Sequence, residues 1–279
     1  MTIAAIDFAR LYRDHLATTT RTRKNASDWD QRAPGMASKA LRSNYAAEFV
    51  ARMDLTGAIS LLDVGCGPGT IGLAVADQLE RVVGLDYSAA MLGVMQAKAA
   101  EMGMGQVVQT LHRAWEDDWS DVPVCDIVVA SRSTTVEDIA SALAQLHAKA
   151  RLRVYLTHLV GGDFTDPAIQ AAVGRRMPTV PDYIYLINIL HRMGIHPRLD
   201  YIAHENRLAD ATDFDDFARR VAWSMGGLNA DETERLRAWY EGASPEQRQG
   251  VPMRWAFISW EKNPGLFHVA RRPGDEYDC

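Results

Sequence analysis

Three glycines and two aspartates near residue 60 form the part of this sequence best suited to hold a ligand. They are Asp63, Gly65, Gly67, Gly69 and Asp86, each aspartate ending an apolar run. The glycine spacing predicts a sharp bend at Gly65, close approach of a ligand to bare backbone at Gly67, and tight packing of a helix at Gly69. An acidic side chain about 20 residues downstream can accept two hydrogen bonds from a ribose diol. The pattern therefore indicates a site for a nucleoside.

The residues from about 58 to 160 alternate short apolar runs with longer amphipathic runs. Apolar runs with Val, Ile and Leu at successive positions are typical of strands covered on both faces. Strict alternation of strand and helix implies right-handed crossovers and a parallel sheet. The expected strands are 59–65, 81–86, 106–111, 125–131 and 151–159, and the expected helices are 70–79, 88–103 and 136–150.

The remainder of the chain adds helices and two more strands. Further helices are expected at 167–176, 181–194, 213–225 and 230–242, and further strands at 197–207 and 253–262. Residues 205–252 are interpreted as a helical insertion, because strand-like sequence flanks them on both sides. We therefore predict an α/β fold with a doubly wound, mostly parallel seven-stranded sheet. Residues 1–57 are expected to form an N-terminal helical arm or lid, and residues 58–279 a domain that includes the insertion.

The glycine turn narrows the class of nucleoside. A dinucleotide-binding turn has the pattern GxGxxG, and its third glycine would fall on Thr70 in this chain. The actual spacing, GxGxG preceded by Asp63, resembles the class I S-adenosylmethionine-dependent methyltransferases. Their first motif is similar to LLDVGCGPG, and their second is similar to VVGLDYS followed by a helix that contains Met91. The resemblance covers residues 58–160 and implies a Rossmann-like methyltransferase fold.

The resemblance also implies the cofactor and the residues that bind it. The cofactor is expected to be S-adenosyl-L-methionine and the product S-adenosyl-L-homocysteine. The glycine turn would hold the methionyl part, Asp63 would orient its amino group, and Asp86 would bind the ribose hydroxyls. The segment HRAWEDDW departs from the family's usual adenine-binding turn because it lacks Gly-Asp, and its two tryptophans have the alternative of simply packing together. The expected cofactor-binding residues are Asp63, Gly65, Cys66, Gly67, Gly69, Asp86, Tyr87, Met91, Trp115, Glu116 and Ser131.

The sequence says less about the methyl acceptor. A sulfonium methyl is already activated, so catalysis needs alignment and, for some acceptors, a base. The segment ASRSTT lacks the (Asp/Asn/Ser)-Pro-Pro-aromatic motif of adenine-amine methylation. At the end of the fifth expected strand, His158 is a candidate base, although a strand-end histidine can instead hydrogen-bond a loop. The expected substrate-binding residues are Trp29, Arg132, His158, Tyr183 and Tyr185, with ordinary helix packing as the alternative for the two tyrosines.

Composition limits the classes of partner. The chain has 279 residues and a formal net charge of -6, which makes nucleic acid an improbable partner. Its three cysteines and eight histidines show no metal-ligand spacing, so no metal is expected. Cysteine usage and the absence of an apolar run long enough for a membrane indicate a cytoplasmic protein. The leading hypothesis is a methyltransferase for a small organic molecule, and the alternatives are an RNA methyltransferase and a non-catalytic S-adenosylmethionine-binding protein. The oligomeric state stays open, a homodimer included.

Overall fold

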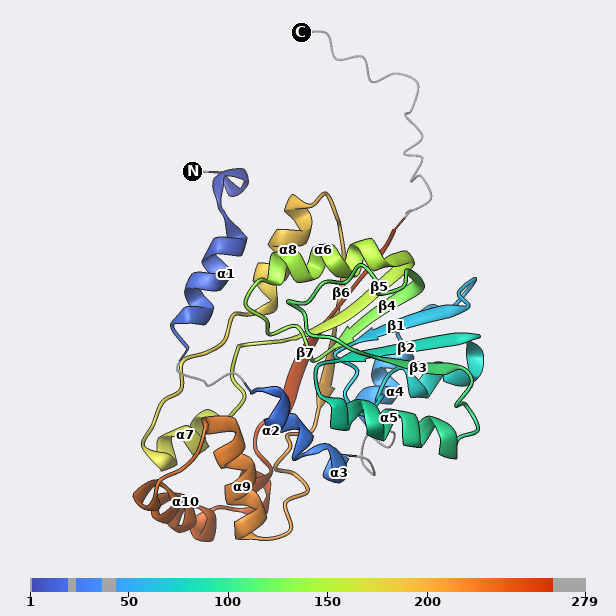
Figure 1. The fold of residues 1–279 in the computed structure, drawn as a ribbon. Coiled ribbons are helices and arrows are strands. Elements are labelled where there is room, and N and C mark those ends of the chain that lie inside the picture. The colour runs from blue at the N-terminus through green and yellow to red at the C-terminus, as the bar shows by residue number, and fades with distance from the viewer. Residues whose placement is uncertain (1, 20–23, 37–43, 263–279) are drawn as a thin grey trace.

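A seven-stranded sheet forms the centre of the molecule, in the strand order β3-β2-β1-β4-β5-β7-β6 (Figure 1). The computed structural model describes residues 2–19, 24–36 and 44–262. β7 runs antiparallel to β5 and β6, and the other neighbouring strands are parallel. The strands are β1 (Ser60–Val64), β2 (Arg81–Asp86), β3 (Val108–His112), β4 (Cys125–Ser131), β5 (Ala150–Leu159), β6 (Arg198–His204) and β7 (Met253–Glu261).

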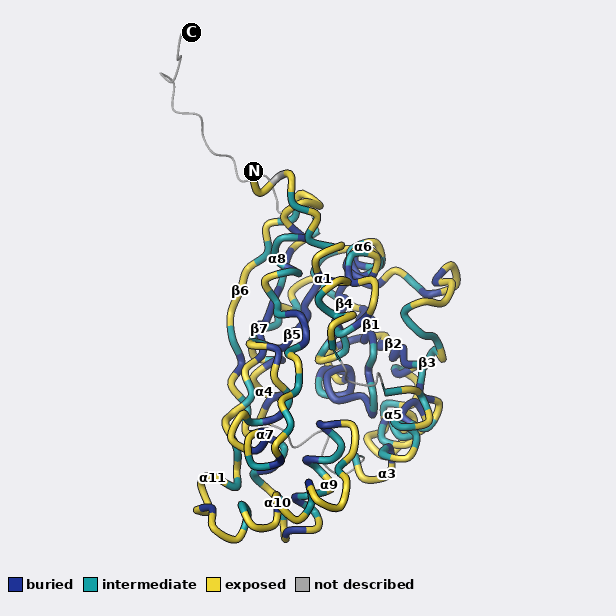
Figure 2. Tube along the Cα trace, turned by 90° about the vertical axis from the view of Figure 1, so that its left-hand side faces the viewer, coloured by how far each residue is buried: buried dark blue, intermediate teal, exposed yellow. Residues whose placement is uncertain are grey.

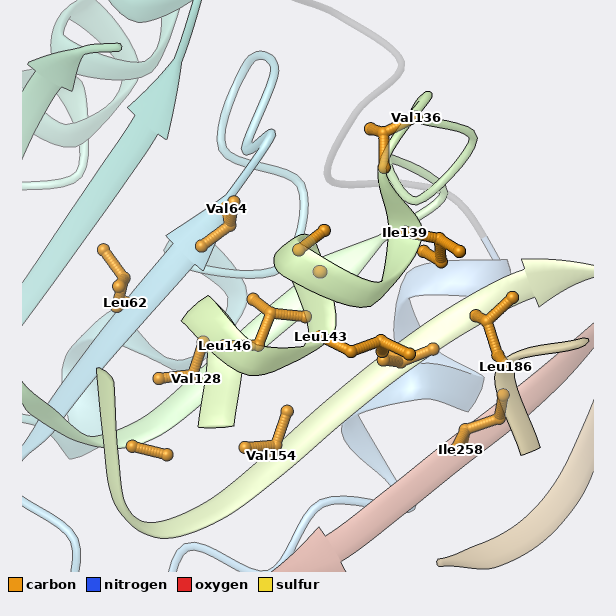
Figure 3. Packing of buried hydrophobic residues seen from close by; sticks show 14 of the residues in the cluster. Leu62, Val64, Val128, Val136, Ile139, Leu143, Leu146, Val154, Leu186 and Ile258 are labelled. Atoms are coloured by element: carbon orange, nitrogen blue, oxygen red, sulfur yellow. The ribbon is translucent and has the colours of Figure 1, made fainter. Parts of the chain in front are cut away.

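Two layers of helices cover the sheet. One face is covered by α1 (Phe8–Ala17), α6 (Ile139–Lys149) and α8 (Tyr183–Arg192), and the other by α4 (Asn44–Val50), the 3₁₀ helix η3 (Leu73–Gln78) and α5 (Ala89–Glu101). Figure 3 shows Leu143 and Leu146 of α6 lying over Val128 and Val154 of the sheet. Successive residues of the central strands are buried on opposite faces, which explains their unbroken apolar sequence.

The insertion between β6 and β7 is helical, with α9 (Phe214–Met225), α10 (Ala230–Gly242) and α11 (Pro245–Gln249). These helices lie below the sheet in Figure 1, next to α7 (Pro167–Val173). α7, α9 and α10 share a hydrophobic cluster of their own, separate from both faces of the sheet. Figure 2 shows buried residues along the central strands, whereas the outer surface of α10 and α11 is exposed. The predicted fold class is confirmed, including the helical insertion.

The described part of the N-terminal arm contains η1 (Ile3–Ala5), α1, α2 (Ala26–Asp30), α3 (Ala33–Met36) and α4. Residues 20–23 and 37–43 of the predicted arm lie outside the described residues. Among the helices that the structure describes, none is both long and apolar enough to cross a bilayer.

One expected helix differs from the prediction. The segment 70–79 forms turns followed by the 3₁₀ helix η3 instead of an α-helix. The N–H of Gly72 donates to Asp63 Oδ2 at 2.9 Å, and Ala74 N donates to Ile71 O in the 3₁₀ pattern. A 3₁₀ helix rises about 2.0 Å per residue against about 1.5 Å in an α-helix. Segment 70–79 therefore spans more distance per residue between the glycine turn and the start of β2.

The order of the strands locates the site. β1 has β2 on one side and β4 on the other, so the chain changes its winding direction between β1 and β4. In open α/β sheets, ligands bind beyond the carboxyl ends of the strands at this switch point. The glycine turn follows β1 directly and lies at that edge.

Candidate functional site

The turn after β1 is closed on one side and open on the other. Gly65 N and Cys66 N donate to Leu85 O at 2.7 and 3.1 Å, which ties the turn to the end of β2. Gly65 has a φ of +65°, and a Cβ there would lie 2.4 Å from Ser133 Cβ. Gly67 has a φ of +53°, and a Cβ there would have no atom within 4 Å. Backbone at Gly67 therefore faces open space, and only glycine leaves that space free.

Asp86 lies beside this open backbone. Its Oδ2 accepts a hydrogen bond from Gly67 N at 2.8 Å, and its Oδ1 accepts one from Ser88 N at 2.8 Å. Burial raises the pKa of the carboxyl, while the backbone N–H groups oppose that rise. A carboxylate has about four lone-pair positions, so two bonds leave acceptor capacity for a ligand. Asp86 is thus fixed in position and still able to accept hydrogen bonds.

Asp63 is the residue in this site with an unsatisfied buried atom. The side chain is 1% exposed, Oδ2 accepts from Gly72 N, and Oδ1 has no hydrogen-bond partner among the described residues. Burial and the nearby charge of Asp86 raise the pKa of Asp63 to about 7, although the Gly72 N–H acts in the opposite direction. A buried acceptor without a donor is costly. A ligand with a cationic N–H group would satisfy it.

A cavity of about 1880 Å³ opens at this edge of the sheet. Typical small-molecule pockets measure about 300–1,000 Å³, so this volume exceeds the need of one ligand. Sequence-predicted residues from five separate segments line it: Trp29, Asp63, Gly65, Cys66, Gly67, Asp86, Tyr87, Met91, Trp115, Glu116, Ser131 and Arg132. The structure thus brings most of the predicted site residues together around one space.

The N-terminal arm closes over this cavity through α2. Asp30 Oδ1 accepts hydrogen bonds from Ser88 Oγ at 2.5 Å and from Ala90 N at 3.2 Å, which fixes α2 to the start of α5. Trp29 meets Trp223 of α9 edge-to-face, with 5.5 Å between ring centroids. The arm and the insertion therefore contact each other above the cavity.

The two tryptophans after β3 pack together, and one of them also lines the cavity, so both interpretations of this segment fit the structure. Trp115 stacks on Trp119 with 5.5 Å between centroids, and Trp119 Nε1 donates to Ala114 O at 3.0 Å. Trp119 is buried, whereas Trp115 also lines the cavity. The two rings pack together, and one of them presents a face to the ligand space.

His158 does not reach the cavity, so the structure does not support it as a base or as a substrate-binding residue. It is buried, with Nε2 3.0 Å from Pro181 O and Nδ1 2.8 Å from Thr134 Oγ1. A carbonyl only accepts, so Nε2 carries the proton, and the Thr134 hydroxyl beside Nδ1 also bonds Thr157 O at 3.0 Å. Burial lowers the pKa of His158 to about 4. The histidine is neutral and joins β5 to the loop before α8.

Tyr183, Tyr185 and Gly69 also lie outside the cavity lining. The hydroxyl of Tyr183 bonds that of Tyr201 on β6 at 2.7 Å, and the hydroxyl of Tyr185 bonds His15 Nδ1 on α1 at 3.1 Å. These contacts make α8 a packing helix instead of a lid. A Cβ on Gly69 would lie 2.7 Å from Leu73 Cγ, so this glycine serves helix packing.

The residues that support Arg132 carry no signal in the sequence. Tyr45 of α4 is fully buried, and its hydroxyl bonds Ser131 Oγ at 2.8 Å and Thr157 Oγ1 at 2.6 Å. The guanidinium of Arg132 lies 4.2 Å from the centre of the Tyr45 ring. Arg32 lies 4.3 Å from the Trp223 ring in the same way. No local pattern in the sequence signals these pairs, because their members are far apart along the chain.

The chain belongs to the class I S-adenosylmethionine-dependent methyltransferase family. A family model described as a methyltransferase domain matches residues 61–153, which include the glycine turn and Asp86. The cofactor of this family is S-adenosyl-L-methionine, and its product is S-adenosyl-L-homocysteine. An uncharacterized protein of Haemophilus influenzae is 35% identical over 264 residues, which cover 93% of this chain and 98% of that protein.

Other similar proteins share only part of the sequence or only the fold. Trans-aconitate 2-methyltransferase of Paracidovorax citrulli is 37% identical over 94 residues, 33% of this chain and 34% of that protein. The solved structure of YcgJ from Bacillus subtilis has a TM-score of 0.54 at 14% identity and covers 78% of this chain and 97% of its own. Geranyl diphosphate C-methyltransferase from Streptomyces coelicolor has a TM-score of 0.51 at 14% identity and covers 94% and 99%. These structural likenesses extend the same fold over nearly the whole chain.

Proposed function

We propose that this chain transfers a methyl group from S-adenosyl-L-methionine to a small organic acceptor in the cavity at the end of β1. The observation that carries the proposal is the unpartnered buried Oδ1 of Asp63. Asp63 lines the same cavity as the open backbone of Gly67 and the carboxylate of Asp86. A ligand that offers an ammonium group and a ribose diol matches these three features together.

Individual residues would hold the parts of the cofactor as follows. Asp63 Oδ1 would accept a hydrogen bond from the ammonium group, and Asp86 would accept hydrogen bonds from the ribose hydroxyls. Gly67 would let the methionyl part lie against its backbone. Trp115 and Met91 line the cavity near the end of β2 and would contact the adenine.

The bound cofactor supplies a methyl group on a cationic sulfur, which is electrophilic without further activation. The chain therefore has to align the acceptor and exclude water. Ser131 and Arg132, at the end of β4, line the cavity next to the glycine turn and would position the acceptor. Trp29 and Trp223, which meet above the cavity, would keep water out.

Three observations favour a small molecule over the alternatives. The formal net charge of -6 opposes the phosphate contacts that RNA binding needs. A cofactor-binding protein without turnover needs no acceptor space, whereas the volume of about 1880 Å³ exceeds what a typical ligand occupies. One relative, matched over 94 residues, is named for a small acceptor, trans-aconitate.

Calorimetric titration of the purified protein with S-adenosyl-L-homocysteine tests the donor site. Asp86→Ala should weaken binding by about 1.5–3 kcal/mol, because hydrogen bonds to a charged group are lost. Asp77→Ala is the matched control, since Asp77 is exposed on η3 and does not line the cavity.

Gly67→Ala gives a second, independent variant. Gly67 and Gly103 both have a positive φ and empty space around a built Cβ, but only Gly67 lines the cavity. Alanine should therefore strain the backbone similarly at both positions and weaken binding at least about tenfold only at Gly67. A folded wild-type protein that does not bind the ligand would contradict the proposal.

A further inference from the structure

Two of the arginines that line the cavity, Arg132 and Arg32, lie against aromatic rings and have no carboxylate partner among the described residues. Arg132 makes no ion pair with any described residue, and its only hydrogen bond there is from the backbone N–H to Thr157 Oγ1 at 3.0 Å. Within the same described ranges, Arg32 also makes no ion pair. Their guanidinium groups rest on aromatic rings instead. A guanidinium has five N–H donors, and those of both residues stay available to a ligand.

A third arginine that lines the cavity, Arg220, forms ion pairs with carboxylates of the protein. Arg220 on α9 bonds Asp216 at 2.5 Å and also pairs with Asp210. Its positive charge is thus satisfied within the protein. The charge of Arg220 nevertheless acts on Arg32, whose pKa is lowered by burial and by this neighbour. The positive charge of Arg32 is therefore opposed by its surroundings and would gain from an anion.

The backbone of Arg132 has a conformation that is unfavourable for residues other than glycine. Its φ is +58°, and among the described residues it alone has a positive φ without being glycine. Such a backbone costs energy for any residue with a Cβ, and residues of this kind cluster at ligand sites. Hydrogen bonds with Ser131 and Thr157 fix the buried Tyr45 side chain, and its ring contacts the guanidinium of Arg132. The fold thus holds one cation rigidly at the end of β4, beside the glycine turn.

We propose that the methyl acceptor is a small organic oxyanion, a carboxylate or a phosphate, and that Arg132 and Arg32 bind its negative charge. This inference rests on the proposed function. The planar guanidinium fork matches both kinds of oxyanion with two parallel hydrogen bonds. The contacts with Tyr45 and Trp223 are to ring faces and use none of the N–H donors in a hydrogen bond to a described residue.

Methyl transfer to fractionated metabolites tests the charge of the acceptor. A low-molecular-mass extract of bacterial cells is separated on an anion exchanger into bound and unbound fractions, and each is incubated with the enzyme and tritium-labelled S-adenosyl-L-methionine. The labelled product should form from the bound fraction. Phosphatase treatment of that fraction removes a phosphate acceptor and leaves a carboxylate unchanged. A product that forms only from the unbound fraction overturns the inference.

Variants connect the charge to the two arginines. Arg132→Gln and Arg32→Gln should each raise KM for the active fraction about 10- to 100-fold, while S-adenosyl-L-homocysteine still binds. Arg132→Lys, which keeps the charge, should recover part of the loss. The matched control is Arg248→Gln, because Arg248 also stacks on a ring, that of Tyr240, at 4.4 Å but lies outside the cavity lining. Unchanged KM in both cavity variants overturns the inference.

Arg132→Gly separates a binding role from a structural one. Glycine suits the positive φ, so this variant should unfold about 2–4 °C higher than the wild type while KM rises. A residue kept for stability alone would show the opposite change in thermal midpoint, and that result would contradict the assignment. If no fraction yields product although the cofactor binds, the proposed function itself fails, and the inference fails with it.

Discussion

At the scale of single residues, Asp63 has a carboxyl whose ionisation the unliganded fold opposes. Its pKa is about 7 in the folded chain, against an ordinary value of 3.8. Because the folded-state pKa is raised, ionisation costs stability. The cost is absent below pH 3.8, grows as the pH rises towards 7, and is complete above it. An ammonium group beside Oδ1 would remove much of this cost, which links the strain of the free protein to ligand binding.

Asp63→Asn should therefore stabilise the free protein more at pH 8 than at pH 4.5. The pKa values of about 7 and 3.8 set an upper limit of about 3 kcal/mol on this difference between pH 4.5 and pH 8. The same variant should bind S-adenosyl-L-homocysteine more weakly at pH 8, because the carboxylate that faces the ammonium group is gone. Urea unfolding of both proteins at the two pH values measures the effect. An identical pH dependence of the free energy of unfolding in wild type and variant would contradict it.

At the scale of elements, α2 is held by α9 as well as by α5. α2 has 5 residues, too few to be stable as an isolated helix. Trp223 of α9 contacts Trp29 and carries Lys24 and Arg32 over its ring, at 4.2 and 4.3 Å. The side chain of Trp223 thus contacts three residues of the arm.

Trp223→Ala should release the arm while leaving the sheet intact. We expect amide hydrogen exchange in residues 26–30 to accelerate at least about tenfold, since local opening of a short helix loses its main apolar contact. Binding of S-adenosyl-L-homocysteine should weaken about 3- to 10-fold, because Trp29 lines the cavity. Trp239→Ala is the control, since Trp239 packs on Phe217 inside the insertion and does not line the cavity. Equal exchange in both variants would show that α2 is held by other contacts.

The elements also show what the sequence can and cannot reveal. The central strands were predictable, because buried parallel strands leave continuous apolar runs such as Ile127–Ala130. The glycine turn and Asp86 were predictable because their spacing reflects local geometry. The partners of Arg132 and Trp29 were not, since Tyr45 and Trp223 come from α4 and α9 and meet them only through tertiary packing. The predicted substrate-binding role of Tyr183 and Tyr185 does not fit the structure for the same reason, because their hydroxyl groups bond neighbours on β6 and α1.

At the scale of the whole molecule, the cavity lies where the sheet, with a hydrophobic core on each face, meets the separately packed insertion. The sheet and its helices provide Asp63, Asp86 and Arg132, whereas the insertion provides Trp223 and Arg220. The insertion has its own cluster, which includes α7 from the segment between β5 and β6. Movement of this cluster relative to the sheet would change the part of the cavity that Trp223 and Arg220 line and leave the part at the glycine turn and Asp86 in place.

Phe217→Ala should accordingly loosen the insertion without unfolding the sheet. Phe217 is fully buried among residues of α7, α9 and α10, and its removal should cost about 3–5 kcal/mol locally. Hydrogen exchange should increase in α7, α9 and α10 and stay slow in β1, β4 and β5. Leu62→Ala, in the core between the sheet and α6, should instead raise exchange throughout. If Phe217→Ala raised exchange uniformly, the insertion and the sheet would form one cooperative unit, and the part of the cavity that the insertion lines could not move independently of the rest.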